Sequence, residues 1–444
     1  MSHTLKEKMV LARKRDRVDL SLKLFVLGMN ILFLHQVLRS LNIMHMVIAY
    51  TGYFILFFSL LWALQEGKLG YLRRGYVNWL LSIWFFAAFM LFYGIILQHE
   101  LRYISHDIWP FTYFAALLVA AKKDTWKTID RMIYFHFTAA IAAVLYIWFT
   151  YYGFAITREK MMLINIAREV PSLYYAWDLL FGWPYMLLTY RGSSLLRRAI
   201  TVFGIGMLLL LALVFEKRFP FVQFALLMFL IMLFPIKLPE GSSTRRVWGS
   251  RAGSLGLVML LSLVAFQVVG SIQKGSGVSY TTRLLDRFTL EGSIIDTVLA
   301  DDRLSGAPKL VLQQAESHEI LLGQGLGSTV WRPQGLSTTI ESGLFAFFLK
   351  GGIIYTTLWY LGLLGPIRNL LIRRKSEIRV FRLLVTFVVL LTPIATIFNA
   401  YPSTGYTMLW LGRCTARKSY KRRKASAGCS SFAKSDCRIE QEGR

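Results

Sequence analysis

The chain is 444 residues long, 55% hydrophobic and only 17% charged, and its 51 Lys and Arg residues against 25 Asp and Glu residues give a net charge of +26. A soluble domain carries about 25% charged residues, so this composition argues against a soluble enzyme and indicates a membrane protein. In a membrane protein a basic excess is typical of the cytoplasmic links between helices. We therefore predict no nucleic-acid partner.

The apolar residues come in blocks of roughly 18–22, each long enough to cross a hydrocarbon core of about 30 Å as a helix. Lipid offers backbone groups no hydrogen-bond partner, and the blocks do not alternate with a period of two, so helices are predicted rather than a barrel. Residues 1–19 are basic and lack a cleavable apolar core, which predicts no removed signal peptide. The predicted spans are 20–38, 43–64, 77–97, 104–121, 132–152, 174–190, 199–215, 219–236, 252–271, 342–364 and 381–398.

Every second link between the predicted spans is basic. Lys68, Arg73 and Arg74 lie in one such link, and residues 122–127 and 191–198 form two others. Because basic links stay in the cytoplasm, this alternation predicts an all-α polytopic membrane protein with about 11 or 12 spanning helices and one large outer loop. The predicted divisions are a cytoplasmic tail at 1–19, helices one to nine at 20–271, a periplasmic loop at 272–340, C-terminal helices at 341–412 and a basic tail at 413–444.

The composition changes near Leu411. The residues that follow are basic and rich in serine, and they hold all three cysteines of the chain, Cys414, Cys429 and Cys437. A disulfide framework is therefore not predicted. Two interpretations stay open: a cytoplasmic tail, or a change of reading frame that removed a further helix.

A glycine-rich stretch, "LGQGLGS" at Leu322–Ser328, lies near the end of the large loop. Its spacing is G-x-G-x-G, whereas the dinucleotide fingerprint is G-x-G-x-x-G between a strand and a helix. Taken alone, the stretch is equally consistent with a tight turn that uses glycines at positive φ just before the chain re-enters the membrane and with a functional motif.

The turn belongs to an ordered set of features. Arg218 lies in a tight outer hairpin, Arg303 begins an amphipathic segment that ends at the glycine turn, Glu341 opens the next span, and Gly351-Gly352 follow about ten residues into that span. This set resembles the O-antigen polymerase and O-antigen ligase family of bacterial membrane glycosyltransferases. The resemblance covers roughly residues 200–400.

The resemblance implies transfer of a glycan from undecaprenyl diphosphate at the outer face of the bacterial inner membrane. No set of His, Asp and Glu residues has the spacing of metal ligands, so we expect neither a metal nor a cofactor. Arg218 and Arg303 are the implied diphosphate ligands, since the Arg fork stays charged and binds phosphate bidentately. Their charge would stabilise the leaving diphosphate as it develops. The alternatives are an interfacial Arg218 and an Arg303 paired with neighbouring aspartates.

Transfer to a sugar hydroxyl is helped by a general base. The ligase branch has a His where this chain has Glu341, which favours a polymerase over a ligase. His318 is the only other candidate base that we single out. The alternatives are a carboxylate that caps a helix N-terminus for Glu341 and an exposed loop residue for His318.

Several further residues are predicted to bind the substrate. Arg283 and Arg287 lie four residues apart and would share a helix face, and Asp178 is an ionisable residue within a span, where it lines the acceptor path or pairs with another helix. The full predicted substrate-binding set is Arg283, Arg287, Arg332, Asp178, Gly323, Gly325 and Gly327.

The sequence thus favours a repeat-unit polymerase for O-antigen, capsule or another exopolysaccharide. Its expected partners are an undecaprenyl-diphosphate-linked glycan, membrane lipid, a chain-length regulator and a flippase. A ligase that joins finished polymer to lipid A-core is the first alternative. A transporter of lipid-linked oligosaccharide is the second, although transporters typically show internal repeats and broken helices, and we find no internal repeat.

Overall fold

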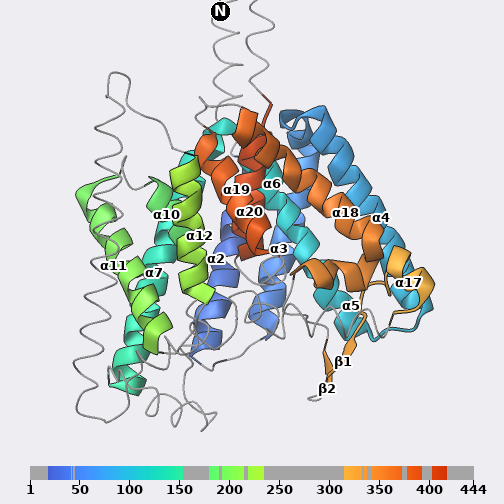
Figure 1. Cartoon of the computed structure of the whole chain (residues 1–444), viewed down its shortest axis with the longest axis horizontal. Helices are drawn as coiled ribbons and strands as arrows, with labels where there is room; N and C mark the ends of the chain where they lie inside the picture. The colour runs from blue at the N-terminus through green and yellow to red at the C-terminus, as the bar shows by residue number, and fades with distance from the viewer. Residues whose placement is uncertain are drawn as a thin grey trace, which may run out of the picture.

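A computed structural model describes residues 19–41, 43, 46–153, 180–189, 193–214, 219–234, 315–332, 335–337, 343–372, 378–392 and 403–417. Within these residues the chain is a bundle of helices with one short hairpin (Figure 1). The longer helices are α2 (Leu20–Ser40), α3 (Met46–Gln65), α4 (Arg74–Ile96), α7 (Trp126–Tyr152), α11 (Leu195–Val214) and α18 (Gly343–Ile372). The shorter ones are α5 (Leu101–Ile108), α6 (Phe114–Ala121), α10 (Trp183–Thr189), α12 (Phe219–Leu233), α17 (Ser317–Leu322), α19 (Arg379–Leu391) and α20 (Ser403–Thr415).

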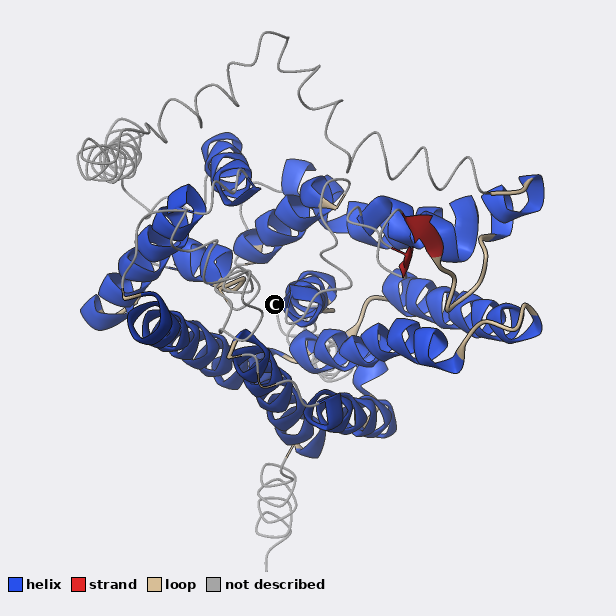
Figure 2. Cartoon of the chain, turned by 90° about the horizontal axis from the view of Figure 1, so that it is seen from below, coloured by secondary structure: helices blue, strands red, loops and turns tan. Residues whose placement is uncertain are grey.

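Short elements connect and extend these helices. The 3-10 helices are η1 (Lys68–Tyr71), η2 (Trp109–Tyr113) and η3 (Lys123–Thr125). Strands β1 (Val330–Arg332) and β2 (Gly335–Ser337) pair antiparallel, with Trp331 opposite Leu336. Figure 2 shows this hairpin at one side of the helical bundle.

Seven helical segments among the described residues are long and apolar enough to cross a membrane. Large apolar side chains remain exposed on some of them, as at Phe85 on α4 (78% exposed) and Val47 on α3 (74% exposed), and lipid is the solvent that suits such surfaces. The chain is therefore an all-α multi-pass membrane protein, as predicted. The predicted span at 252–271 and residues 174–179 and 190 of the one at 174–190 lie outside the described residues.

The successive spans α2, α3, α4, α5–α6 and α7 run in alternate directions, so the links between them lie at two ends of the bundle (Figure 1). We call the end that carries η1 and η3 the basic face, and the end that carries α17 and the hairpin the loop face (Figure 1). Contacts join distant links at the basic face: the amide of Arg73 donates to the carbonyl of Thr415 at 3.2 Å. Two of the predicted basic links, those that contain η1 and η3, thus lie at the same end of the bundle, and the side of the membrane that this end faces stays a prediction.

Two spans are interrupted. The span predicted at 104–121 consists of α5, η2 and α6 in series, and Pro110, which lacks an amide donor, lies in the 3-10 segment between the two helices. In α18 the helix breaks at Gly351 (φ −134°, ψ 16°) and Gly352 (φ 59°, ψ −160°). A non-helical backbone at membrane depth is tolerated where protein buries it, and other segments cover both interruptions.

The centre of the bundle is built on α6 and α20, which pack together. All residues of α6 are buried, and so is nearly all of α20. The helices approach closely because Gly412 has no side chain: a Cβ there would lie 2.3 Å from the carbonyl oxygen of Leu117. Helix α20 continues to Thr415, past the boundary predicted after residue 412.

Candidate functional site

Most of the predicted catalytic and substrate-binding residues lie outside the described residues. These are Arg218, Arg303, Glu341, Arg283, Arg287 and Asp178. The structure places His318 and the three glycines of the turn, and it places the backbone of Arg332 at the end of β1. The roles assigned to all of these residues stay predictions.

His318 lies in α17, a short helix that precedes the glycine turn. Glu316 and Glu319 form a capping box at the start of this helix, an arrangement that satisfies two otherwise unpaired amides. The His318 side chain is 57% exposed, and its Nδ1 lies 3.5 Å from Oε2 of Glu316. It therefore points toward solvent and a neighbouring carboxylate.

Residues 323–328, which we call the glycine loop, form a tight turn. Gly323, Gly325 and Gly327 have φ of 73°, 82° and 85°, a region that side chains with a Cβ disfavour. The turn with glycines at positive φ, one of the two interpretations of this stretch, is confirmed.

The glycine loop packs against the break in α18 with no room for side chains. A Cβ on Gly323 would lie 2.3 Å from the amide nitrogen of Gly351, and one on Gly352 would lie 2.3 Å from the carbonyl oxygen of Leu321. On the other side of the loop, a Cβ on Gly94 of α4 would lie 2.2 Å from the carbonyl oxygen of Leu326. The loop thus fills the space between α4 and α18.

Backbone hydrogen bonds hold the loop in this position. The break in α18 leaves carbonyls without a helical partner, and the loop supplies donors: Gln324 to the carbonyl of Leu349 at 2.8 Å, and Gly325 to the carbonyl of Lys350 at 2.9 Å. The amide of Leu326 donates to the carbonyl of Met90 on α4 at 3.1 Å. The loop and the helix break therefore complete each other's hydrogen bonding.

A buried ion pair lies beside the loop. The ammonium group of Lys350 donates to Oδ1 of Asp107, and the amide of Gly327 donates to Oδ2 of the same carboxylate at 2.8 Å. The side chains of Lys350 and Asp107 are only 8% and 1% exposed. Nearby, Nδ1 of His99 lies 2.9 Å from the carbonyl oxygen of Leu326.

A small pocket opens beside this ion pair. Asp107 and Lys350 form part of its wall, and Phe111, Phe347 and Trp359 line the rest together with other, mostly apolar, residues. The pocket thus combines one buried pair of charges with an aromatic wall, and we take it with the glycine loop as the candidate functional site.

Sequence reasoning missed Asp107 and Lys350, although a usable signal was present. Both are ionisable residues inside predicted spans, and such residues are a functional hypothesis by default. The same rule singled out Asp178. His106, next to Asp107, brings its Nδ1 within 3.6 Å of Oδ1 of Asp107.

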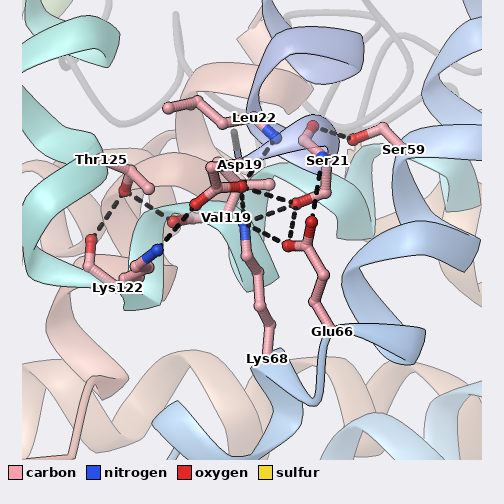
Figure 3. Close-up of polar contacts among 9 residues, drawn as sticks. All are labelled: Asp19, Ser21, Leu22, Ser59, Glu66, Lys68, Val119, Lys122 and Thr125. Atoms are coloured by element: carbon pink, nitrogen blue, oxygen red, sulfur yellow. Dashed lines mark hydrogen bonds and ion pairs between the residues drawn. The ribbon is translucent and has the colours of Figure 1, made fainter. Parts of the chain in front are cut away.

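A second polar cluster lies at the basic face (Figure 3). Asp19, just before α2, accepts hydrogen bonds from Lys68 at 2.5 Å and from Lys122 at 3.0 Å, and Lys68 also contacts Ser21 at 2.5 Å and Glu66 at 3.3 Å. Burial alone would raise the pKa of Asp19, but the two lysines outweigh it and lower this pKa to about 2. The cluster joins the start of α2 to two links of the basic face, the one between α3 and α4 and the one between α6 and α7.

A third polar contact, a partly buried ion pair, joins α7 and α11 near the basic face. Arg197 binds Asp130 through both guanidinium nitrogens, at 2.8 and 2.7 Å. The hydroxyl of Tyr185 donates to the same carboxylate at 2.5 Å. In the described part of the chain no group of three His, Cys, Asp or Glu side chains is placed to hold a metal ion.

No protein-family model, curated protein or solved structure matches this chain.

Proposed function

We propose that this membrane protein is a glycosyltransferase, and that it polymerises glycan repeat units carried on undecaprenyl diphosphate. The observation that carries the proposal is the glycine loop at the loop face, which docks into a break of the helix that follows it. This loop is the central piece of the ordered set by which the sequence resembles the O-antigen polymerase and ligase family. The alternating basic links support a cytoplasmic basic face and an outer loop face.

In the proposed reaction a hydroxyl group of the acceptor glycan attacks the anomeric carbon of the donor sugar. The bond between that carbon and the diphosphate oxygen breaks, and the hydroxyl proton passes to a base, for which Glu341 and His318 are the candidates. Arg218 and Arg303 would bind the diphosphate and stabilise its charge as it leaves. The donor is already activated, so the reaction needs no nucleotide sugar.

The experiment that tests this proposal is the surface-glycan gel profile of a deletion strain. Complementation with the wild-type gene should restore a ladder of polymer lengths, and Arg218→Ala should leave single repeats on lipid A-core. Arg102→Ala is the matched control, because Arg102 is an exposed arginine of the loop face whose pair with Glu100 is also exposed and contributes little. A ladder that persists in the deletion strain would contradict the proposal that this protein is the polymerase.

The gel also separates the ligase alternative from the polymerase. A ligase joins finished polymer to its final acceptor, so its loss should leave full-length polymer on the lipid carrier. That outcome would identify the protein as a ligase, which uses the same kind of lipid-linked donor but a different acceptor.

One observation favours the transporter alternative: the break of α18 at Gly351-Gly352, since discontinuous helices are typical of transporter substrate sites. Purified protein in detergent distinguishes the two, because detergent removes the barrier that transport requires. Extension of lipid-linked repeats in detergent would exclude a pure transporter. If no extension occurs and the protein moves the lipid-linked donor across the membrane of proteoliposomes, the result would favour a transporter.

A further inference from the structure

The glycine loop is held by an unbroken row of hydrogen bonds. The amides of four consecutive residues, Gln324 to Gly327, each donate to an acceptor on a neighbouring helix segment. The first three acceptors are backbone carbonyls, whereas the fourth is the carboxylate of Asp107. Asp107 therefore extends the row of acceptors by one and draws the end of the loop toward α5.

Asp107 and Lys350 lie on two different helices that border the glycine loop. Asp107 lies at the end of α5, and Lys350 lies one residue before the break in α18. The side chain of Lys350 binds Asp107, and its backbone carbonyl binds Gly325. The ion pair therefore joins α5 and α18 beside the point where the glycine loop packs against the break in α18.

A buried ion pair is weak evidence for stability, because removing two charges from water costs free energy that their attraction offsets only when the geometry and the surrounding hydrogen bonds are favourable. A well-packed apolar pair would often hold the helices as firmly. What the charged pair adds is a directional acceptor for Gly327, and both charged side chains are nearly buried beside the docked loop. The loop and the ion pair therefore share one carboxylate.

We propose that Asp107 and Lys350 act as a charge latch that positions the glycine loop, and the chain leading into it, against the break in α18. Resting on the proposed function, we further infer that glycan transfer requires the latch to be closed. Both are positioning residues, which act through the loop rather than on the reacting atoms.

The test compares hydrogen exchange of loop amides in lipid nanodiscs between two double variants. Asp107→Leu/Lys350→Met removes both charges together, so that no unpaired charge stays buried. Asp130→Leu/Arg197→Met does the same to the ion pair between α7 and α11, and it serves as the matched control. We expect amides 324–327 to exchange about tenfold faster in the first variant only. The reason is that the loss of one hydrogen bond lowers the free energy needed for the loop to open locally.

An unchanged exchange rate at 324–327 in a folded latch variant would overturn the latch. If that variant fails to fold, Asp107→Asn replaces it, because the amide keeps an oxygen for Gly327 and weakens only the pairing with Lys350. Faster exchange confined to the loop would then support the latch. Uniformly faster exchange in every peptide would instead overturn it, because the ion pair would then stabilise the whole fold and not the position of the loop.

Transfer is measured separately, by the surface-glycan ladder in cells that carry each variant. Loss of the ladder in the latch variant but not in the control is the expected result. Faster loop exchange with a normal ladder would overturn the requirement for a closed latch while leaving the latch itself in place. If the wild-type protein makes no polymer at all, the proposed function fails, and the exchange experiment still decides the latch.

Discussion

Lys350 on α18 donates a hydrogen bond to Asp107 at the end of α5, although the two residues lie 243 positions apart in the sequence. The carbonyl of the same lysine accepts the amide of Gly325 at 2.9 Å. One residue beside a helix break thus contacts α5 through its side chain and the glycine loop through its backbone. In the described part of the loop face, these two contacts of Lys350 connect α5, α18 and the glycine loop.

Replacing Lys350 alone should destabilise the protein strongly. In Lys350→Met the carboxylate of Asp107, whose side chain is 1% exposed, loses its cation, and breaking a buried pair on one side costs about 3–5 kcal/mol. Thermal unfolding in detergent checks this, with Lys127→Met, an exposed lysine of α7, as the control. Adding Asp107→Leu to Lys350→Met should recover part of the loss, and equal midpoints for the single and double variants would contradict the explanation.

Gly94→Ala should weaken the packing between α4 and the glycine loop. The added Cβ would lie 2.2 Å from the carbonyl oxygen of Leu326, so the loop must move. Gly206→Ala in α11 is the matched control, since a Cβ there meets nothing within 4 Å and alanine stabilises a helix interior by about 0.5–1 kcal/mol relative to glycine. We expect a lower unfolding midpoint for Gly94→Ala and an equal or higher one for Gly206→Ala, and a rise at both positions would show that the loop tolerates the methyl group.

Asp19 should make the protein sensitive to strong acid at the basic face. Its pKa is lowered from 3.8 to about 2, so its stabilising contribution is complete above pH 4 and is lost as the pH falls toward 2. The shift corresponds to about 2 kcal/mol. Unfolding midpoints of wild type and Asp19→Asn, measured between pH 6 and pH 2, should therefore differ at the upper end and converge at the lower end. A difference that stays constant across this range would refute the assignment.

Tyr406→Phe should destabilise the centre of the bundle. The hydroxyl of Tyr406 lies 2.8 Å from Nδ1 of His136, whose Nε2 lies 2.7 Å from Oδ1 of Asn30. His136 is fully buried, so the loss of one partner should cost about 1–3 kcal/mol. Tyr146→Phe is the control, because Tyr146 is 54% exposed. Equal unfolding midpoints for both variants would argue that the histidine finds another partner.

Several features of the fold could be predicted because they depend on local sequence. The apolar blocks that became α2, α3 and α4 are visible in composition alone, since a helix in lipid satisfies its own backbone. The positive φ of Gly323, Gly325 and Gly327 likewise agrees with one of the two interpretations that their spacing allows. The break of α18 falls at Gly351-Gly352, a pair that the sequence analysis noted without predicting a break.

The candidate site could be predicted only in part. The glycine loop was expected, but its seat between α4 and α18 depends on Gly94, which lies more than two hundred residues earlier in the chain. Asp107 and Lys350 could have been singled out as ionisable residues within spans, but nothing near either residue in the sequence indicates that the two form a pair. The burial of α20, which carries Ser403, Thr404 and Thr407 into the core, also could not be foreseen from its hydropathy.

The sequence by itself determined the class of protein, the alternation of its basic links and the turn at the glycines, because hydropathy, charge and backbone freedom are properties of neighbouring residues. Only the tertiary structure decided that Gly327 and Lys350 meet on the carboxylate of Asp107. That meeting depends on how helices from distant parts of the chain pack, and close packing is set by the shapes of both surfaces together.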